Sequence, residues 1–150
     1  MKIVLLYSSL IFSILISYSY SKEILITSDK LMIDRETNIS TFSGNVYVDE
    51  KNMKIWADQL IVKLNYDEDE IEEIFAKNNV KIIRDNIKAT SEIGYYYPLI
   101  DEIKMLENVE VTEDNNIVKC DELVIDIKNS ISIMSSSSDK RVEATIINNN

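Results

Sequence analysis

A repeat with a period near 30 residues constrains the fold of this chain more than any other feature. One series of segments has the pattern Asn-Val-x-apolar, and its units start at positions 44, 78 and 107, which are 34 and then 29 residues apart. A second series (Ser-Asp-Lys-Leu, Ala-Asp-Gln-Leu, Thr-Ser-Glu-Ile and Cys-Asp-Glu-Leu) starts at positions 28, 57, 90 and 120. Two interleaved series with a common period predict repeated units that stack on one another.

Apolar residues alternate with polar residues within the units. Leu60, Val62 and Leu64 share one side of their segment, and residues 123–127 repeat the pattern. A period of two is typical of β-strands with one buried face, and the abundance of Ile and Val agrees with this. The sequence therefore predicts an all-β fold with an apolar interior.

Polar turn signals separate these runs. They lie at residues 34–38, 49–52, 67–70, 84–86, 113–116 and 128–130. This spacing predicts an antiparallel meander of roughly a dozen short strands. A jelly roll, a sandwich and a solenoid all satisfy the pattern, and periodicity does not choose among them.

Two segments need separate interpretation. Ile71, Ile74 and Phe75 have helical spacing, so residues 67–75 could form a helical turn, although a strand that starts near Glu72 fits the repeat better. The four serines at 135–138 are expected to form a loop.

The first 21 residues have the pattern of a secretory signal peptide. Lys2 precedes an apolar run at residues 3–16, and small residues at Ser19 and Ser21 favour cleavage before Lys22. The run is short for a membrane span, which needs about 20 residues, so an uncleaved anchor is the alternative. We expect a signal peptide at 1–21, a mature domain at 22–147 and a disordered tail at 148–150.

The charge balance excludes one class of partner. The chain has 16 basic and 26 acidic residues, and loss of Lys2 with the signal peptide would leave a net charge of −11. Such a chain should be repelled by nucleic acid. The single cysteine, Cys120, allows no intramolecular disulfide and is expected to be a small buried apolar residue.

The sequence offers little for catalysis. It contains no histidine, so the commonest general base and the commonest metal ligand are missing. The acidic pairs at 72–73, 101–102 and 121–122 could act as acid and base, and the acidic run at 67–70 could bind calcium weakly. These positions fall in turns or on outward faces, so solvated side chains are the better interpretation. We expect no enzyme activity, no metal site and no cofactor.

The aromatic residues alternate in the same way. Tyr96 should lie on one face of its strand, with Tyr95 and Tyr97 on the other. Trp56 lies between Ile55 and Ala57 and should point outward as a cover or a protein contact.

The chain resembles the OstA-like family of lipopolysaccharide-transport proteins, which includes LptA. The residues that carry the resemblance are Phe-Ser-Gly-Asn-Val at 42–46, the run Ile-x-Ala-Asp-x-Leu-x-Val at 55–62, and Tyr-x-Pro at 96–98 before Ile103. Weaker matches continue through 121–123 and 141–144, and Asn78 and Glu107 replace the usual Gly of the family.

The resemblance implies an antiparallel, twisted open β-jelly roll in a periplasmic protein that carries lipopolysaccharide from the inner to the outer membrane. It also implies LptC-like and LptD-like partners joined by edge-strand pairing, with a possible head-to-tail homo-oligomer. The lipid A acyl chains would lie against the apolar interior, for which the expected residues are Val46, Val48, Ile55, Leu60, Val62, Leu64, Val80, Ile82, Ile87, Ile103, Met105, Val109, Val111, Leu123 and Ile125.

Other functions remain open at this stage. An LptC-like relative would keep an N-terminal membrane anchor, and a strand-pairing scaffold would have a closed core without a lipid. A carboxylate-based enzyme acting on carbohydrate is a third alternative.

Overall fold

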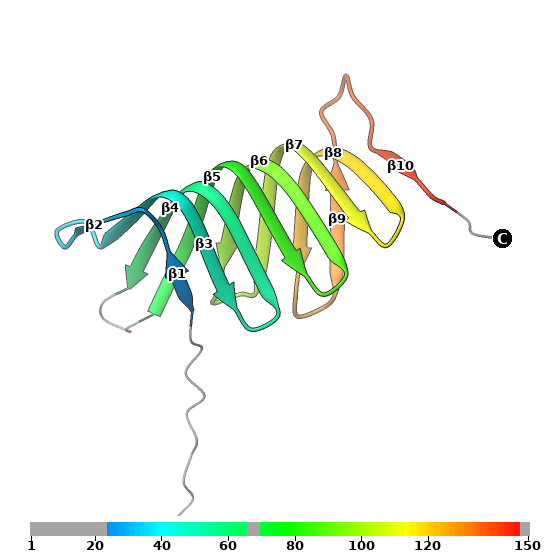
Figure 1. Cartoon of the computed structure of the whole chain (residues 1–150). Coiled ribbons are helices and arrows are strands. Elements are labelled where there is room, and N and C mark those ends of the chain that lie inside the picture. Colours follow the sequence, from blue (N-terminus) through cyan, green and yellow to red (C-terminus); the bar gives the residue numbers. More distant parts are fainter. Residues whose placement is uncertain (1–23, 66–69, 148–150) are drawn as a thin grey trace, which may run out of the picture.

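The computed structural model describes residues 24–65 and 70–147, which form one continuous antiparallel sheet rolled upon itself (Figure 1). From β3 to β8 the order of strands in the sheet follows the order in the chain, and β1 with β2 and β9 with β10 complete the two ends. The strands of the described chain are β1 (Leu25–Thr27), β2 (Lys30–Asp34), β3 (Ile39–Glu50), β4 (Met53–Asn65), β5 (Glu70–Arg84), β6 (Ile87–Tyr97), β7 (Glu102–Glu113), β8 (Asn116–Asp126), β9 (Ile131–Ser135) and β10 (Glu143–Thr145). The predicted all-β jelly roll is confirmed.

The strand count and lengths differ from the expected dozen short strands. Strands β3 to β8 have 11 to 15 residues each, so units that the sequence divides into separate strands are joined in one strand. The helical alternative for residues 67–75 is wrong in the part described, because Glu70 to Phe75 belong to β5. The expected signal peptide and the tail at 148–150 lie outside the described residues.

In the described chain, tight turns occur at the predicted segments 34–38, 49–52, 84–86, 113–116 and 128–130. Of the predicted turn at 67–70 only Glu70 is described, as the first residue of β5. Each of the five tight turns has a residue with positive φ, such as Lys51 (50°), Asp85 (53°) and Asp114 (53°). Asn and Asp enter this left-handed region more readily than most residues, which explains their use at these turns.

Each long strand bends near its middle. On β3, β5 and β7 the bend consists of two successive left-handed residues: Gly44 and Asn45, Asn78 and Asn79, and Glu107 and Asn108. The strand register shifts at the same places, so two residues of one strand oppose a single residue of the next, as in a β-bulge. The Asn-Val series of the sequence therefore marks bends rather than strand interiors.

An acidic residue lies opposite each bend, and it comes from the second sequence series. Asp58 of β4, Glu92 of β6 and Asp121 of β8 hold these positions. Asn45 donates a side-chain hydrogen bond to Oδ2 of Asp29, and Asn79 donates one to Oδ2 of Asp58, both at 2.8 Å. Residues of the two repeat series therefore meet at the bends. We call the line of these bends the corner of the fold.

The bends divide the sheet into two layers that face each other. Layer one consists of β1, β10 and the strand halves at residues 46–50, 53–57, 80–84, 87–90, 109–113 and 116–120. Layer two consists of β2, β9 and the strand halves at residues 39–43, 59–65, 70–77, 93–97, 102–106 and 121–126. Near the corner the layers are close, because a Cβ placed on Gly94 of layer two would lie 3.0 Å from Cγ1 of Val80 in layer one. The turns at the opposite edges of the two layers form the mouth of the roll.

Candidate functional site: the interior and its mouth

All fifteen residues expected in the interior belong to one apolar cluster between the layers. Twelve of them are buried, and Leu64, Ile87 and Ile125 are partly buried at its margin. Leu60 and Met105, one from β4 and one from β7, are 0% exposed. The alternation in the sequence thus locates the interior correctly; contact of these residues with a lipid stays a prediction.

Several interior residues were missed by the sequence reasoning. They are Met53, Ala57, Ile74, Ala76, Ala89 and Tyr96. The sequence does contain a pattern that could have identified some of them. On β4 the buried positions are odd-numbered up to Ala57 and even-numbered from Leu60, so the alternation of buried and exposed residues shifts by one at Asp58. The same change occurs at Glu92 and Asp121, and it marks where the even-numbered strands bend.

The interior is filled by its own side chains. A cavity between the layers, lined by Ile55, Ile74, Val80 and neighbours, has a volume of about 10 Å³. A single water needs roughly this much space, and an acyl chain needs far more. Entry of a lipid would therefore require the two layers to separate.

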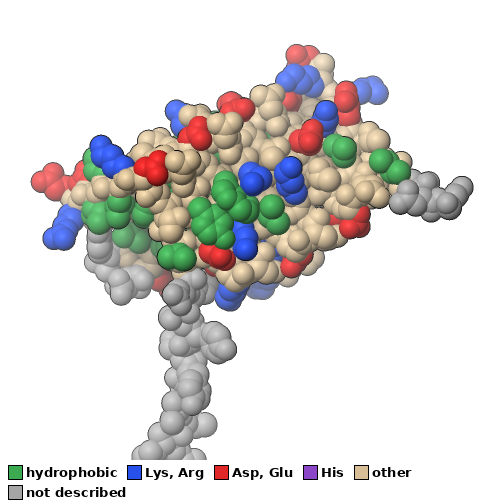
Figure 2. Space-filling model, in the orientation of Figure 1, with side chains coloured by type: hydrophobic (Ala, Val, Ile, Leu, Met, Phe, Trp, Pro, Cys, Tyr) green, Lys and Arg blue, Asp and Glu red, His purple; other side chains and the backbone are tan. Residues whose placement is uncertain are grey.

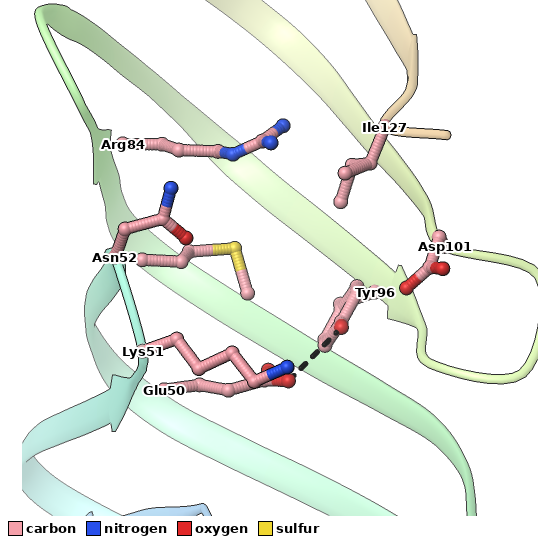
Figure 3. A pocket seen from close by; sticks show the side chains of 8 residues that line it. Glu50, Lys51, Asn52, Arg84, Tyr96, Asp101 and Ile127 are labelled. Carbon is pink, nitrogen blue, oxygen red and sulfur yellow. Dashed lines mark hydrogen bonds between the residues drawn. The ribbon is translucent and has the colours of Figure 1, made fainter. Parts of the chain in front are cut away.

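The mouth contains a larger cavity with a polar lining. Its volume is about 190 Å³, and it lies between the β3–β4 turn of layer one and the β6–β7 turn of layer two (Figure 3). The residues that line it are Glu50, Lys51, Asn52, Met53, Arg84, Tyr96, Asp101 and Ile127.

Glu50 and Tyr96 connect the two layers across this mouth. The Tyr96 hydroxyl donates to Oε1 of Glu50 at 3.3 Å (Figure 3). Glu50 is only 5% exposed, which corrects the expectation that residues 49–52 form a solvated turn; it is the last residue of β3 and points inward. Within the described chain, its Oε2 atom has no hydrogen-bond partner.

Burial raises the pKa of Tyr96 well above the ordinary value of a tyrosine, and the nearby charge of Glu50 raises it further. The hydroxyl therefore keeps its proton and remains a donor at any physiological pH. The carboxylate of Glu50 is held in place by this donor, and both residues contribute to the lining of the cavity.

Aromatic side chains cover the outer faces of both layers. Tyr96 lies on the opposite face of its strand from Tyr95 and Tyr97, as the sequence predicts, and the structure places Tyr96 inside. Tyr95 also stacks on Phe75 with ring centroids 4.8 Å apart. Trp56 lies outward beside Tyr47, with Nζ of Lys81 at 3.9 Å from its ring centre. Figure 2 shows hydrophobic and basic side chains gathered near the middle of the visible face.

Cys120 is buried, and burial raises the pKa of its thiol, in agreement with a packing role. Among the described residues, no group of three or more His, Cys, Asp or Glu side chains is placed to hold a metal ion. Within residues 24–65 and 70–147, no helix is long and apolar enough to cross a membrane.

A family model described as LptA/(LptD N-terminal domain) LPS transport protein matches residues 25–131. The chain belongs to this family. The resemblance inferred from the residues at 42–46 and 55–62 is thereby confirmed, and the LptA/LptD N-terminal family is a family of lipopolysaccharide-transport proteins rather than of enzymes.

A solved structure supports the same fold for this LptA/LptD N-terminal family member. It is LptH, described as the LptA-homologous periplasmic component of the conserved lipopolysaccharide-transport device from Pseudomonas aeruginosa. The two share 13% sequence identity with a TM-score of 0.75, over 85% of this chain and 96% of LptH. No curated protein sequence gives a significant match.

Proposed function

We propose that this protein works in the periplasm after export and carries lipopolysaccharide from the inner to the outer membrane. The observation that carries the proposal is the apolar cluster that runs between the two layers from β3 to β8, in a member of a lipopolysaccharide-transport family. The acyl chains lie against this cluster, and the fifteen residues predicted from the sequence are the contacts.

The affinity comes mainly from the acyl chains. Each buried CH₂ group contributes about 0.8 kcal/mol, whereas a protein with a net charge near −10 repels phosphates at long range. The acyl chains enter from the mouth, because the corner holds the layers together on the other side.

The two ends of the sheet are suited to partners. Leu31, Met32 and Ile33 of β2 are each about half exposed, and Ile131 and Ile133 of β9 are similarly exposed at the other end. Terminal strands offer unpaired backbone groups as templates for another chain. LptC-like and LptD-like proteins, or further copies of this chain joined head to tail, would pair with these edges.

Photo-crosslinking in cells tests the transport function. A crosslinker at Val62 or Ile103, which are 3% and 1% exposed, should capture lipopolysaccharide. The matched controls are Lys63 and Lys104, the next residues on the same strands, which face outward and should capture none. Absence of capture at both interior sites in a folded protein would overturn the proposal.

Depletion of the protein in its native host provides the second test. Lipopolysaccharide should accumulate at the inner membrane, because the step that removes it is lost. The filled interior also suits a closed strand-pairing scaffold, which would bind no lipid probe and whose loss would leave lipopolysaccharide distribution unchanged.

A further inference from the structure

The third bend differs from the first two in how its polar side chains are paired. At the first two bends, the side chain of Asn45 or Asn79 donates a 2.8 Å hydrogen bond to the acidic residue that precedes it at the corner. Asn108 is the equivalent residue at the third bend, and Glu92 is the acidic residue that precedes it. No hydrogen bond joins these two exposed side chains in the described chain. The third bend therefore leaves an amide and a carboxylate open where the repeat would pair them.

A depression lies beside these two groups on the outer side of the corner. Its volume is about 390 Å³, and the residues that line it are Trp56, Asn79, Val80, Lys81, Thr90, Ser91, Glu92 and Asn108. The lining extends from β4 to β7, and three strand spacings of about 4.8 Å make it about 14 Å long. The depression is therefore elongated and has the volume of an ordinary small-molecule site.

The lining combines an aromatic ring with hydrogen-bonding groups of both kinds. Trp56 forms one end, and Nζ of Lys81 lies 3.9 Å from its ring centre. Glu92 supplies acceptor oxygens, the Asn108 amide both donates and accepts, and Thr90 supplies a hydroxyl group. A sugar ring has apolar C–H groups on its faces and hydroxyl groups around its edge, and an acetamido group adds one donor and one acceptor. A short chain of N-acetylated sugars therefore suits this lining.

We propose that the depression is a binding site for a short N-acetylated glycan, separate from the interior and the mouth. Trp56 and the aliphatic stem of Lys81 pack against the C–H groups of one sugar ring. Glu92 accepts a hydrogen bond from a hydroxyl group of the next ring, and Asn108 pairs with an acetamido group. Because Glu92 offsets the charge of Lys81, the site does not select an anionic ligand by charge. The corner lies opposite the mouth, so a bound glycan does not compete with a lipid in the interior.

Fluorescence of Trp56 reports directly on the site, because it is the only tryptophan in the chain. Titration of the full mature chain with chitotetraose, which carries hydroxyl and acetamido groups, should give a saturable change in emission. Glu92→Ala removes the acceptor and should weaken binding about two- to ten-fold, the usual effect of one hydrogen bond. Glu113→Ala, at an exposed position on the far edge of layer one, is the matched control and should leave the affinity unchanged.

A second variant keeps the test valid if Glu92→Ala folds poorly. Asn108→Gly removes the amide but keeps the positive φ of 55° accessible, so the bend can form, and it should weaken chitotetraose binding by a similar factor. Isothermal titration calorimetry checks each affinity independently of Trp56. Excess lipid A should not displace chitotetraose, because the two ligands lie on opposite sides of the roll.

Three outcomes would overturn the glycan site. The first is no saturable response of the wild type, or equal affinity in the wild type and both site variants. The second is a stronger response of Trp56 to polyglutamate than to chitotetraose, because the depression would then recognise charge. The third is displacement of chitotetraose by lipid A, which would assign the depression to the lipid. The transport function is tested separately by lipid capture in the interior, and it would stand if the first or second outcome were observed.

Discussion

Asn79 donates a 2.8 Å hydrogen bond from its side-chain amide to Oδ2 of Asp58, across the point where β4 and β5 both bend. The bond joins one member of each sequence repeat, and Asn45 with Asp29 forms the preceding copy. A similar pairing recurs at the turns of layer one, where Asn52 donates to Asp85 at 3.1 Å. The Asn and Asp content of the chain therefore has a structural use at both the corner and the mouth.

A double-mutant cycle on the corner pair measures its contribution. Asp58→Ala and Asn79→Ala should each lower the free energy of unfolding, and the double variant should lose less than the sum by about 1 kcal/mol, the usual size of a net hydrogen bond. Urea denaturation of the four proteins supplies the values. Additive losses would mean that the bend is held by backbone pairing alone.

The residues with positive φ at the bends lead to two opposite predictions. Replacing a glycine at a bend should lower stability, and introducing one at the equivalent position of another bend should raise it. Gly44 has φ of +79°, and a Cβ there would lie 2.5 Å from Oδ2 of Asp29, so Gly44→Ala should destabilise by about 1–3 kcal/mol. Glu107 has φ of +66° with a full side chain, so Glu107→Gly should stabilise by up to about 1 kcal/mol. Thermal unfolding monitored by circular dichroism resolves both changes.

Glu92 provides the control for the glycine prediction. It lies opposite a bend but outside the left-handed region, so Glu92→Gly should lose stability by about 0.5–1 kcal/mol. If Glu92→Gly and Glu107→Gly shift the melting temperature in the same direction, backbone strain at Glu107 is not the reason.

Asp121 makes the last corner sensitive to acid. The backbone N–H of Ser137 donates to its Oδ2 at 3.0 Å, and Lys140 approaches Oδ1 at 3.0 Å. The hydrogen bond from the Ser137 backbone, followed by that from Lys140, lowers the pKa of Asp121. A lowered folded-state pKa gives stability that is present above the ordinary aspartate value of about 4 and is lost as the pH falls below it.

Hydrogen exchange at the Ser137 amide tests this dependence. Exchange should be slow at neutral pH and, corrected for intrinsic rates, less protected below about pH 4. Asp121→Ala, which removes the acceptor oxygens, should remove the protection already at pH 7. Asp139→Ala is the control, because Asp139 accepts the Ser137 hydroxyl, at 2.8 Å, whereas the Ser137 amide donates to Asp121 and should stay protected.

Tyr96 should make the free energy of unfolding depend on pH in the alkaline range. Its pKa is raised by burial and by Glu50, so the unfolded chain loses this proton first, and the free energy of unfolding should fall as the pH rises above about 10. Tyr96→Phe should make that decline shallower. At pH 7 it should cost about 1–3 kcal/mol, because both Glu50 oxygens are then left without a donor. Denaturation at several pH values checks both effects, and identical slopes for the two proteins would contradict the assignment.

The interior could be predicted from the sequence because burial leaves a period of two. Leu60, Val62 and Leu64 have few alternatives once their segment is a strand, and the same alternation predicts that Tyr96 lies opposite its two tyrosine neighbours. The alternation of apolar and polar residues is a local property, so it can be recognised without knowledge of the tertiary structure.

The bends and the mouth could not be predicted in this way. A pair such as Asn78 and Asn79 occurs equally in hairpin turns, and only the partner strand decides that the chain continues instead of reversing. Glu50 looks like part of a polar turn, and its burial depends on Tyr96, 46 residues later in the chain. Contacts of this kind form only when the two layers assemble, and they produce no periodic pattern in the sequence.

The order of the strands has a consequence for how such a protein could change size. From β3 to β8 each strand pairs with its neighbours in the chain, without a crossover. Each added strand extends the sheet by about 4.8 Å, so duplication of one hairpin would lengthen the molecule by about 10 Å and leave its cross-section intact. Gene duplication could therefore change the length of the molecule in steps of one hairpin. The corner, the interior and the mouth would keep the same structure.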